Sequence, residues 1–423
     1  MLDVLIYLVL PAVLLVLGLP IFLTLFVTCI VILLVAGLPT GGIQIYMFGS
    51  LDNFPLLAIP FFVLAGEIMA QGGVARRIVV WVISVIGGVP GSLAVTTVAA
   101  SELFGAMTHT AVGTVVAVGR MTYPSLREGG YDERFAAGLI ASSGAIAVVI
   151  PPSIAMIIYS MVAQQSAIAL FTAGILPSLL IGLVDALYVM AYARFKGVPS
   201  NPRTNWAAIW ASTRDASWSL GTIIVIFGGI YGGIFTPTEA AGVAVIYSLF
   251  VTMVVHREVN FADLWRIITS AVGLIAQIMI IVTAAGIYAS LLTTSGHPAA
   301  DRRQHQRAPS AGLGDVAVPE RDPAGDGKLS RAAGRNPDPD ASPAPDRPGC
   351  RRTSHSLRII MAVNLSIGMY TPPFGLNLFA SQAVFETPLG TVYRGVLPFV
   401  LLNFVTLLVI TYVPAISTAF LAP

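Results

Sequence analysis

Long apolar runs, separated by short polar stretches, make up most of the chain. The first run, residues 4–36, has no charged side chain and is divided by Pro11 and Pro20. Because a helix needs about 20 apolar residues to cross a membrane, we interpret this run as one long or two short spanning helices. The long runs lack the period-two alternation of a half-buried strand, so helices are predicted throughout. The further predicted segments are residues 54–71, 78–99, 102–119, 135–150, 152–172, 174–194, 218–235, 238–256, 264–295, 359–371, 373–385 and 392–416.

Together these runs predict an all-α polytopic membrane protein of about ten to twelve membrane segments. Three regions, 102–119, 135–150 and 359–385, are interrupted by Gly, Pro, Ser, Thr or Asn. At membrane depth, backbone groups released from a helix must bond inside the protein or line a cavity, because hydrocarbon offers them no partner. Paired interruptions of this kind are typical of the binding sites of secondary transporters.

Two of these regions resemble each other. Residues 139–159 read LIASSGAIAVVIPPSIAMIIY, and residues 360–379 read IMAVNLSIGMYTPPFGLNLF. Aligning their Pro-Pro pairs places Ser143 on Asn364. Because the match falls on unusual residues, we interpret the two regions as copies of an internal repeat; two unrelated proline kinks are the alternative.

The composition agrees with a membrane protein. Of the 423 residues, 56% are hydrophobic and 10% are charged, and the mean hydropathy is +0.83. An ordinary soluble domain is roughly 25% charged, so this composition argues against a soluble enzyme, a nucleic-acid-binding protein and a disordered protein. The net charge of +2 does not indicate a polyanionic partner, and two cysteines provide neither a disulfide framework nor a cysteine-rich metal site.

Residues 297–356 differ in composition from everything around them. They hold 18 of the 44 charged residues and 9 of the 28 prolines, and they contain no Ile, Phe, Tyr, Trp or Met. One interpretation is a disordered, solvated loop between two membrane blocks. The other is a stretch translated in the wrong reading frame, because a one-base shift of the codons for residues 297–301 and 338–347 permits apolar strings.

Four separated blocks of the chain resemble one protein family. They are PLLAIPFFVLAGEIM (55–69), GYDERFAAGLIASSGAIAVVIPPSIAMIIY (130–159), GGIYGGIFTPTEAAGVAVIY (228–247) and NLSIGMYTPPFGLNLF (364–379). In this order they are similar to the DctM-like large membrane subunit of tripartite ATP-independent periplasmic (TRAP) transporters. The resemblance covers nearly everything except residues 297–356.

This resemblance implies a permease of the bacterial inner membrane that is not an enzyme. It implies sodium-coupled import of small organic acids, such as C4-dicarboxylates, by an elevator-type fold with inverted repeats and re-entrant hairpins. The implied partners are a small membrane subunit, a periplasmic substrate-binding protein and the lipid bilayer, with no nucleic acid. Sodium is the implied coupling ion, and no cofactor is expected.

Two other functions stay open on the residues alone. One is a proton-coupled antiporter with Glu67, Asp185 or His109 as the relay, and the other is an intramembrane enzyme. The sequence contains no P-loop, HExxH or Gly-x-Ser-x-Gly motif, so neither ATP coupling nor these catalytic sites is indicated.

The family pattern also divides the chain. Residues 1–215 correspond to a first half with a first hairpin and a PPS break, residues 216–296 to the start of the second repeat, and residues 357–423 to its end with a TPP break. In the family a second hairpin lies where residues 297–356 stand, and the strings that the frame shift permits match the family pattern. We therefore favour a frame error, and we expect the chain as written to lack half of the binding region and to fail in transport.

The helix interruptions supply the candidate binding residues. Thr108, His109 and Thr110 stand where the family has a Ser-Gly-Ser-like tip that helps to bind sodium. Threonine hydroxyls still offer oxygen to a hard cation, whereas His109 is either a substrate or proton ligand or a hydrogen-bonded core residue. The other candidates for substrate and ion binding are Ser142, Ser143, Gly144, Pro151, Pro152, Ser153, Asn364, Thr371, Pro372, Pro373 and Gly375. The candidate sodium ligands among them are Ser143, Gly144, Thr371 and Gly375.

Several charged residues lie in or beside apolar runs. Residues 236–239, Thr-Pro-Thr-Glu, predict a helix start that is capped by the threonine and stabilised by the glutamate at the positive end of the helix dipole. Glu67 is a candidate partner of Arg76 or Arg77, and the charged residues of 120–134 are interpreted as a solvated loop. The acidic residues of the apolar runs are Glu67, Glu102, Asp185 and Glu239.

Overall fold

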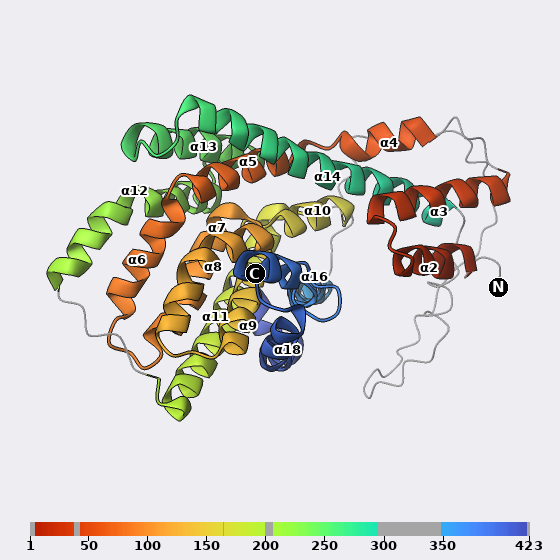
Figure 1. The fold of residues 1–423 in the computed structure, drawn as a ribbon. Helices are drawn as coiled ribbons and strands as arrows, with labels where there is room; N and C mark the ends of the chain where they lie inside the picture. Colours follow the sequence, from red (N-terminus) through yellow and green to blue (C-terminus); the bar gives the residue numbers. More distant parts are fainter. Residues whose placement is uncertain (1–4, 38–42, 164, 199–205, 295–347, 421–423) are drawn as a thin grey trace, which may run out of the picture. The chain divides into compact units, whose positions relative to one another are not determined.

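The computed structural model describes residues 5–37, 43–163, 165–198, 206–294 and 348–420. Within these ranges every regular element is a helix, which confirms the all-α fold (Figure 1). The elements up to residue 196 are η1 (Leu5–Val9), α2 (Leu10–Val16), α3 (Ile21–Ala36), α4 (Ile43–Leu51), η3 (Phe54–Leu57), α5 (Ala58–Gln71), α6 (Val74–Ile86), α7 (Ser92–Thr108), α8 (Ala111–Glu128), α9 (Glu133–Ala145), η4 (Ile146–Val148), α10 (Ile154–Val162) and α11 (Ala167–Lys196). The later elements are α12 (Trp206–Tyr231), α13 (Pro237–Leu249), η5 (Phe250–Val255), α14 (Phe261–Thr294), α16 (Pro348–Gly368), α17 (Leu376–Phe385), α18 (Leu389–Tyr412) and α19 (Ala415–Thr418).

Several of these helices have the length and apolar character of membrane spans, so the chain is a polytopic membrane protein. Five helical segments among the described residues are long and apolar enough to cross a membrane: Phe54–Gln71, Ala167–Lys196, Pro237–Val255, Phe261–Leu292 and Leu389–Tyr412. The shorter apolar helices are Leu5–Val16, Ile21–Ala36, Arg358–Gly368 and Leu376–Phe385. The total of ten to twelve segments stays a prediction, and most of the anomalous segment 297–356 lies outside the described residues.

The chain forms two compact units. Unit 1 comprises residues 1–46 and 284–350, and unit 2 comprises residues 47–283 and 351–423. In unit 1 the Tyr288 hydroxyl of α14 donates a hydrogen bond to the backbone carbonyl of Tyr7. Unit 2 holds every helix interruption from which the sequence predicted binding residues, so the candidate site is built within this unit.

A close crossing of α9 and α18 organises the core of unit 2. A Cβ atom added to Gly138 would lie 2.2 Å from the carbonyl oxygen of Gly395, so only two glycines allow this approach. Beside the crossing, the Phe135 ring stacks on Tyr192 with 3.8 Å between centroids and lies 5.9 Å from the Phe399 ring. These contacts pack α9, α11 and α18 together, and α9 carries three of the candidate binding residues.

One predicted segment, 78–99, was wrong because the structure divides it. α6 ends at Ile86 and α7 begins at Ser92. Between them Gly88 and Gly91 have φ values of 89° and 74°, a left-handed conformation that glycine adopts without a steric penalty. The apolar pattern continues through this turn and therefore conceals it.

The boundary between the predicted segments 152–172 and 174–194 was also wrong. The Ser166 side chain accepts a hydrogen bond from the backbone N–H of Ala169 at 3.3 Å, and this N-cap starts α11. The helix then continues without a second boundary, with Pro177 inside it.

The helix start predicted at residues 236–239 is confirmed. The Thr236 side chain accepts a hydrogen bond from the Glu239 N–H at 3.3 Å, and the Glu239 carboxylate accepts one from the Thr236 N–H at 2.8 Å. This reciprocal capping box satisfies two backbone donors at the start of α13.

Candidate functional site

The first helix break lies between α7 and α8. The Thr108 hydroxyl donates to the Phe104 carbonyl at 3.1 Å and lies 3.2 Å from the Thr114 hydroxyl. His109 then turns the chain with a φ of 58°, and α8 begins after Thr110. The predicted interruption of residues 102–119 is therefore present, and the threonine hydroxyls hold the two helix ends together.

The second break follows α9, and it contacts the first. His109 is 4% exposed, its ring lies edge-on to Phe62 with 4.3 Å between centroids, and neither ring nitrogen has a hydrogen-bond partner among the described residues. On the same helix, a Cβ atom built on Gly105 would lie 2.8 Å from the Ala147 side chain, which precedes the second break. Pro151 and Pro152 are both buried. Two interruptions that are more than 40 residues apart in sequence are thus neighbours in unit 2.

Buried hydroxyl groups line the approach to the second break. The Ser142 hydroxyl donates to the Leu139 carbonyl at 3.0 Å, and the Ser143 hydroxyl lies 3.3 Å from that of Ser101 on α7. The Ser153 hydroxyl donates to the Val148 carbonyl at 2.6 Å. Each of these oxygens keeps lone pairs after its hydrogen is donated, so the set remains able to coordinate a hard cation.

Gly144 and Gly375 occupy positions that leave no room for a side chain. A Cβ atom on Gly144 would lie 2.5 Å from Val115 and 3.3 Å from the Ala111 carbonyl oxygen at the start of α8. A Cβ atom on Gly375 would lie 2.6 Å from the Met369 carbonyl oxygen. Both glycines therefore allow backbone to approach backbone at a helix break.

The third break, between α16 and α17, is the TPP turn. The Thr371 hydroxyl donates to the Ile367 carbonyl at 2.7 Å, and the exposed Pro373 accepts a hydrogen bond from the Tyr393 hydroxyl at 2.8 Å. Pro372 is partly buried. The peptide bonds Pro151-Pro152 and Pro372-Pro373 are both cis.

Two side chains that the sequence did not single out join the third break to the second. The Ser366 hydroxyl donates to the Ala145 carbonyl at 2.7 Å, and the Asn377 amide donates to the Ala141 carbonyl at 2.9 Å. Both acceptors lie in the last turn or so of α9, where carbonyl groups lose their partners inside the helix. In the sequence, only the position of Ser366 and Asn377 on either side of the TPP turn pointed to a role at the break.

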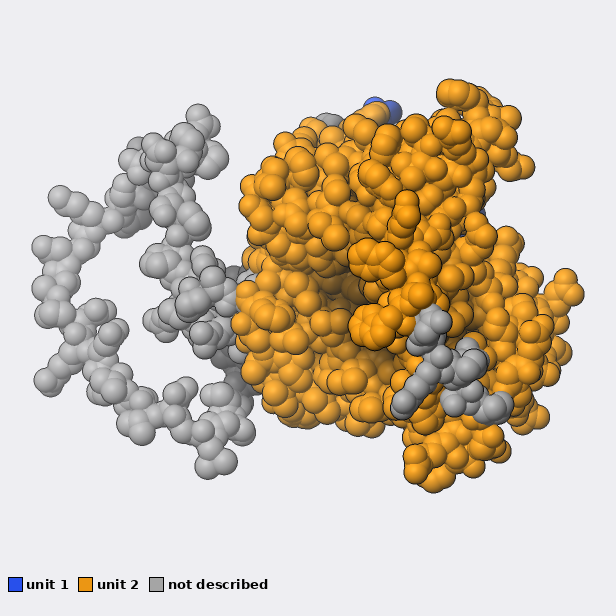
Figure 2. Space-filling view, turned by 90° about the vertical axis from the view of Figure 1, so that its left-hand side faces the viewer, with its two compact units in different colours: residues 1–46, 284–350 blue, residues 47–283, 351–423 orange. Residues whose placement is uncertain are grey.

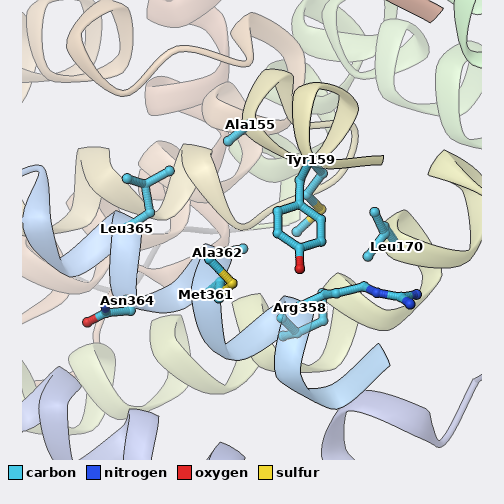
Figure 3. Close-up of a pocket in the computed structure, with 10 residues that line it drawn as sticks. Ala155, Tyr159, Leu170, Arg358, Met361, Ala362, Asn364 and Leu365 are labelled. Atoms are coloured by element: carbon cyan, nitrogen blue, oxygen red, sulfur yellow. The ribbon is translucent and has the colours of Figure 1, made fainter. Parts of the chain in front are cut away.

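Asn364, which the repeat aligned with buried Ser143, lies elsewhere. It is exposed and lines a cavity of about 220 Å³ between α10, α11 and α16, shown in Figure 3. Tyr159 and Arg358 face the same cavity, and Arg358 donates to the Gln165 side chain at 3.1 Å. The structure therefore does not give the two aligned positions the same environment.

A larger cavity of about 770 Å³ lies against α8, and Figure 2 shows that the surface of unit 2 is hollowed. Thr110 and Arg120 line it from α8, together with Arg76 and Glu67 from α6 and α5. Thr110 is the one predicted binding residue that lines this cavity. The interpretation of the charged residues of 120–134 as a loop was wrong for Arg120 and Arg127, which lie in α8, and for Glu133 and Arg134, which begin α9.

Charged groups around this cavity form an ion-pair cluster. Glu258 binds Arg76 at 3.0 Å and Arg77 at 2.7 Å, so the suggested pairing of these arginines with Glu67 was wrong; Glu67 instead accepts a hydrogen bond from Gln71. Burial alone would raise the pKa of Glu258, but the hydrogen bonds and charges of the two arginines outweigh it and lower the pKa. Glu67 and Glu258 line the cavity as well, so its anion-binding character rests on Arg120, which forms no ion pair among the described residues, and on the uncapped helix start.

Comparisons with known proteins find similarity to one protein family over most of the chain. The family model described as "Tripartite ATP-independent periplasmic transporter, DctM component" matches residues 8–300 and 351–416. The C4-dicarboxylate TRAP transporter large permease protein DctM of Pseudomonas aeruginosa is 36% identical over 388 residues, which cover 89% of this chain and 88% of that protein.

Two further relatives carry other substrate names. The ectoine TRAP transporter large permease protein TeaC of Halomonas elongata is 36% identical over 358 residues, covering 82% of this chain and 81% of that protein. The 2,3-diketo-L-gulonate TRAP transporter large permease protein YiaN of Escherichia coli is 33% identical over 389 residues, which cover 86% of this chain and 85% of that protein. The similarity therefore extends across proteins that are named for different substrates.

Proposed function

Since the chain belongs to the DctM family of TRAP transporter large permease subunits, multi-pass proteins of the inner membrane, we propose that it imports small organic acids by sodium symport. The observation that carries this proposal is the meeting of the helix breaks in unit 2. A Cβ atom on Gly144 would lie 3.3 Å from the Ala111 carbonyl oxygen at the first break, and Ser366 and Asn377 bond to the end of α9. Broken helices that share backbone bonds are how secondary transporters build ion and substrate sites at membrane depth.

The candidate sodium ligands supply only oxygen. Ser143 and Thr371 offer hydroxyl oxygens whose hydrogens are already donated within their own helices. The carbonyl oxygens of Gly144 and Gly375 each accept one backbone hydrogen bond, from the N–H groups of Ile146 and Leu378, and each keeps a second lone pair. This donor set suits a hard cation and buries no negative charge that would need a second partner.

The larger cavity supports an anionic substrate. Arg120 lines it without an ion-pair partner among the described residues, whereas Arg76 is paired with Glu258, which also lines it. The first turn of α8 has no side-chain cap, so backbone N–H groups are available there. A small carboxylate such as a C4-dicarboxylate fits this charge pattern. The relatives named for ectoine and diketogulonate mean that the particular acid has to be determined by experiment.

The proposed partners are a small membrane subunit and a periplasmic substrate-binding protein, and the proposed motion is of the elevator type. The test is uptake of radiolabelled succinate into proteoliposomes that contain both membrane subunits, with loaded binding protein outside. Initial rates are compared with inward gradients of sodium and of potassium. The assay uses the chain that the resequenced gene encodes, so that a frame error across 297–356 does not enter the comparison.

A matched pair of variants tests the sodium ligands. Thr371→Val removes a hydroxyl that donates to the Ile367 carbonyl at 2.7 Å, and Thr411→Val removes one that donates to the Leu407 carbonyl at the same distance. We expect only Thr371→Val to raise the sodium concentration needed for half-maximal uptake. Equal uptake with potassium, or uptake driven by a pH gradient alone, would contradict sodium symport.

A further inference from the structure

Buried polar groups of α7, α11 and α18 meet beside the third helix break. Asp185, inside α11, has no exposed surface, and Asn403 of α18 is 2% exposed. The Asn403 amide nitrogen donates to Asp185 Oδ1 at 3.2 Å and to the Tyr370 hydroxyl at 3.0 Å. Asn403 Oδ1 and Asp185 Oδ2 have no hydrogen-bond partner among the described residues. The asparagine is thus held against the aspartate with two buried acceptor oxygens left over.

Glu102, on α7, provides a second carboxyl group near Asp185. A Cβ atom built on Gly182 would lie 1.8 Å from Glu102 Oε1, so the carboxyl group rests on α11 one turn before Asp185. Glu102 is partly exposed, but its Oε1 is buried and has no hydrogen-bond partner in the described structure, so an unpaired carboxyl oxygen lies on α11 within one turn of Asp185.

No positive group balances this pair. The other titratable groups that interact with Asp185 are the hydroxyls of Tyr188 on α11 and Tyr370 after α16. Across the described residues, neither carboxyl group forms an ion pair with a lysine, arginine or histidine. A charged carboxylate inside a membrane protein needs such a partner, because neither hydrocarbon nor packed protein replaces the water that solvated it.

A bound proton accounts for both the missing basic partner and the unpaired acceptor oxygens. It removes one negative charge, and it converts one acceptor oxygen into an O–H donor that can bond a neighbouring oxygen. A metal cation would need open space between its oxygen ligands, whereas the Glu102 carboxyl group is packed directly on the Gly182 backbone. We propose that Asp185 and Glu102 form a proton-binding site, in which one of the two carboxyl groups carries a proton taken from water and Asn403 holds Asp185 in place.

The site touches the third break through the bond of Asn403 to Tyr370 but includes none of the candidate sodium ligands, so the proposal holds whichever ion drives transport. Its test is infrared spectroscopy of the purified full-length chain at neutral pH, where a protonated carboxyl group gives a C=O stretching band that shifts in D2O. We expect this band in the unaltered protein. Asp185→Asn or Glu102→Gln should reduce it, and the double variant should lose the contribution of the pair.

Asp132→Asn is the matched control, because Asp132 is an exposed N-cap that accepts a hydrogen bond from the Arg134 N–H, and its substitution should leave the band unchanged. Thermal unfolding shows that each variant is folded, and Glu102→Gln tests the pair from another helix if Asp185→Asn does not fold. The proposal is overturned if the unaltered protein has no such band, if the double variant keeps it in full, or if it appears only without sodium, which would indicate a bound metal ion. The same band in sodium and in potassium chloride supports it.

Discussion

The close contact of α9 with α18 gives a prediction whose size follows from the structure. In Gly138→Ala the new Cβ atom would lie 2.2 Å from the Gly395 carbonyl oxygen, whereas an ordinary contact begins at 3.4 Å. The two helices must therefore separate by about 1.2 Å at their crossing. Because the atoms in conflict belong to the backbone, no change of side-chain rotamer relieves the contact.

Overpacking of this kind costs about 1–3 kcal/mol of folding free energy. The higher helix propensity of alanine returns about 1 kcal/mol, so a rigid backbone contact at the upper end of the range leaves a loss of about 2 kcal/mol. At about 2 °C per kcal/mol, the unfolding midpoint should fall by about 4 °C. The measurement is thermal unfolding of the purified protein in detergent, followed by intrinsic fluorescence.

Gly242→Ala provides the control, because a Cβ atom at Gly242 meets nothing within 4 Å. This substitution in α13 should keep the midpoint or raise it slightly through helix propensity alone. If Gly138→Ala unfolds no earlier than Gly242→Ala, then α9 and α18 do not pack on this pair of glycines and the reasoning is refuted.

Three further outcomes are expected. Arg120→Gln removes a positive charge from the larger cavity and should lower anion uptake several-fold, while Arg194→Gln at the end of α11 should not; equal rates would exclude the cavity from substrate binding. Because the pKa of Glu258 is lowered, its ion pairs stabilise the protein fully above pH 4.5 and are lost as the pH falls through the lowered pKa. The unfolding midpoint should therefore fall more steeply on acidification in the unaltered protein than in Glu258→Gln, and parallel curves would contradict the ion pairs. Sequencing of the gene should reveal compensating frame errors across 297–356, and a chain verified to carry this segment as written should not transport; sodium-dependent uptake by that chain would overturn this prediction.

The helix breaks show how much of the local structure could be predicted from the sequence. Proline lacks a backbone N–H and glycine has a low helix propensity, so their clusters with hydroxyl residues made the breaks near 109, 151 and 372 predictable. A single proline does not decide a break, because α11 continues through Pro177. Exact boundaries were not: an apolar run continues through the turn between α6 and α7, and hydrophobicity alone cannot distinguish turn from helix there.

The partners of each break could not be predicted in the same way. Ser366 and Asn377 bond to α9 from more than 220 residues away, and nothing local to either residue specifies that contact. The same holds for Asn403, which no sequence pattern connected with Asp185. Asn364 shows the opposite case, because the alignment of similar segments paired it with Ser143, which is buried, whereas Asn364 is exposed.

The sequence by itself determined the class of this protein, its helical fold, the resemblance that identified its family and the places where its helices break. These follow from local properties: the length of apolar runs, the missing N–H of proline and the conformational freedom of glycine. Only the tertiary structure decided which breaks meet, which arginines line a cavity and which carboxyl groups lie inside the protein without a basic partner. Such contacts depend on the packing of distant helices, because the free energy of a buried polar group is set by the neighbours that replace water around it.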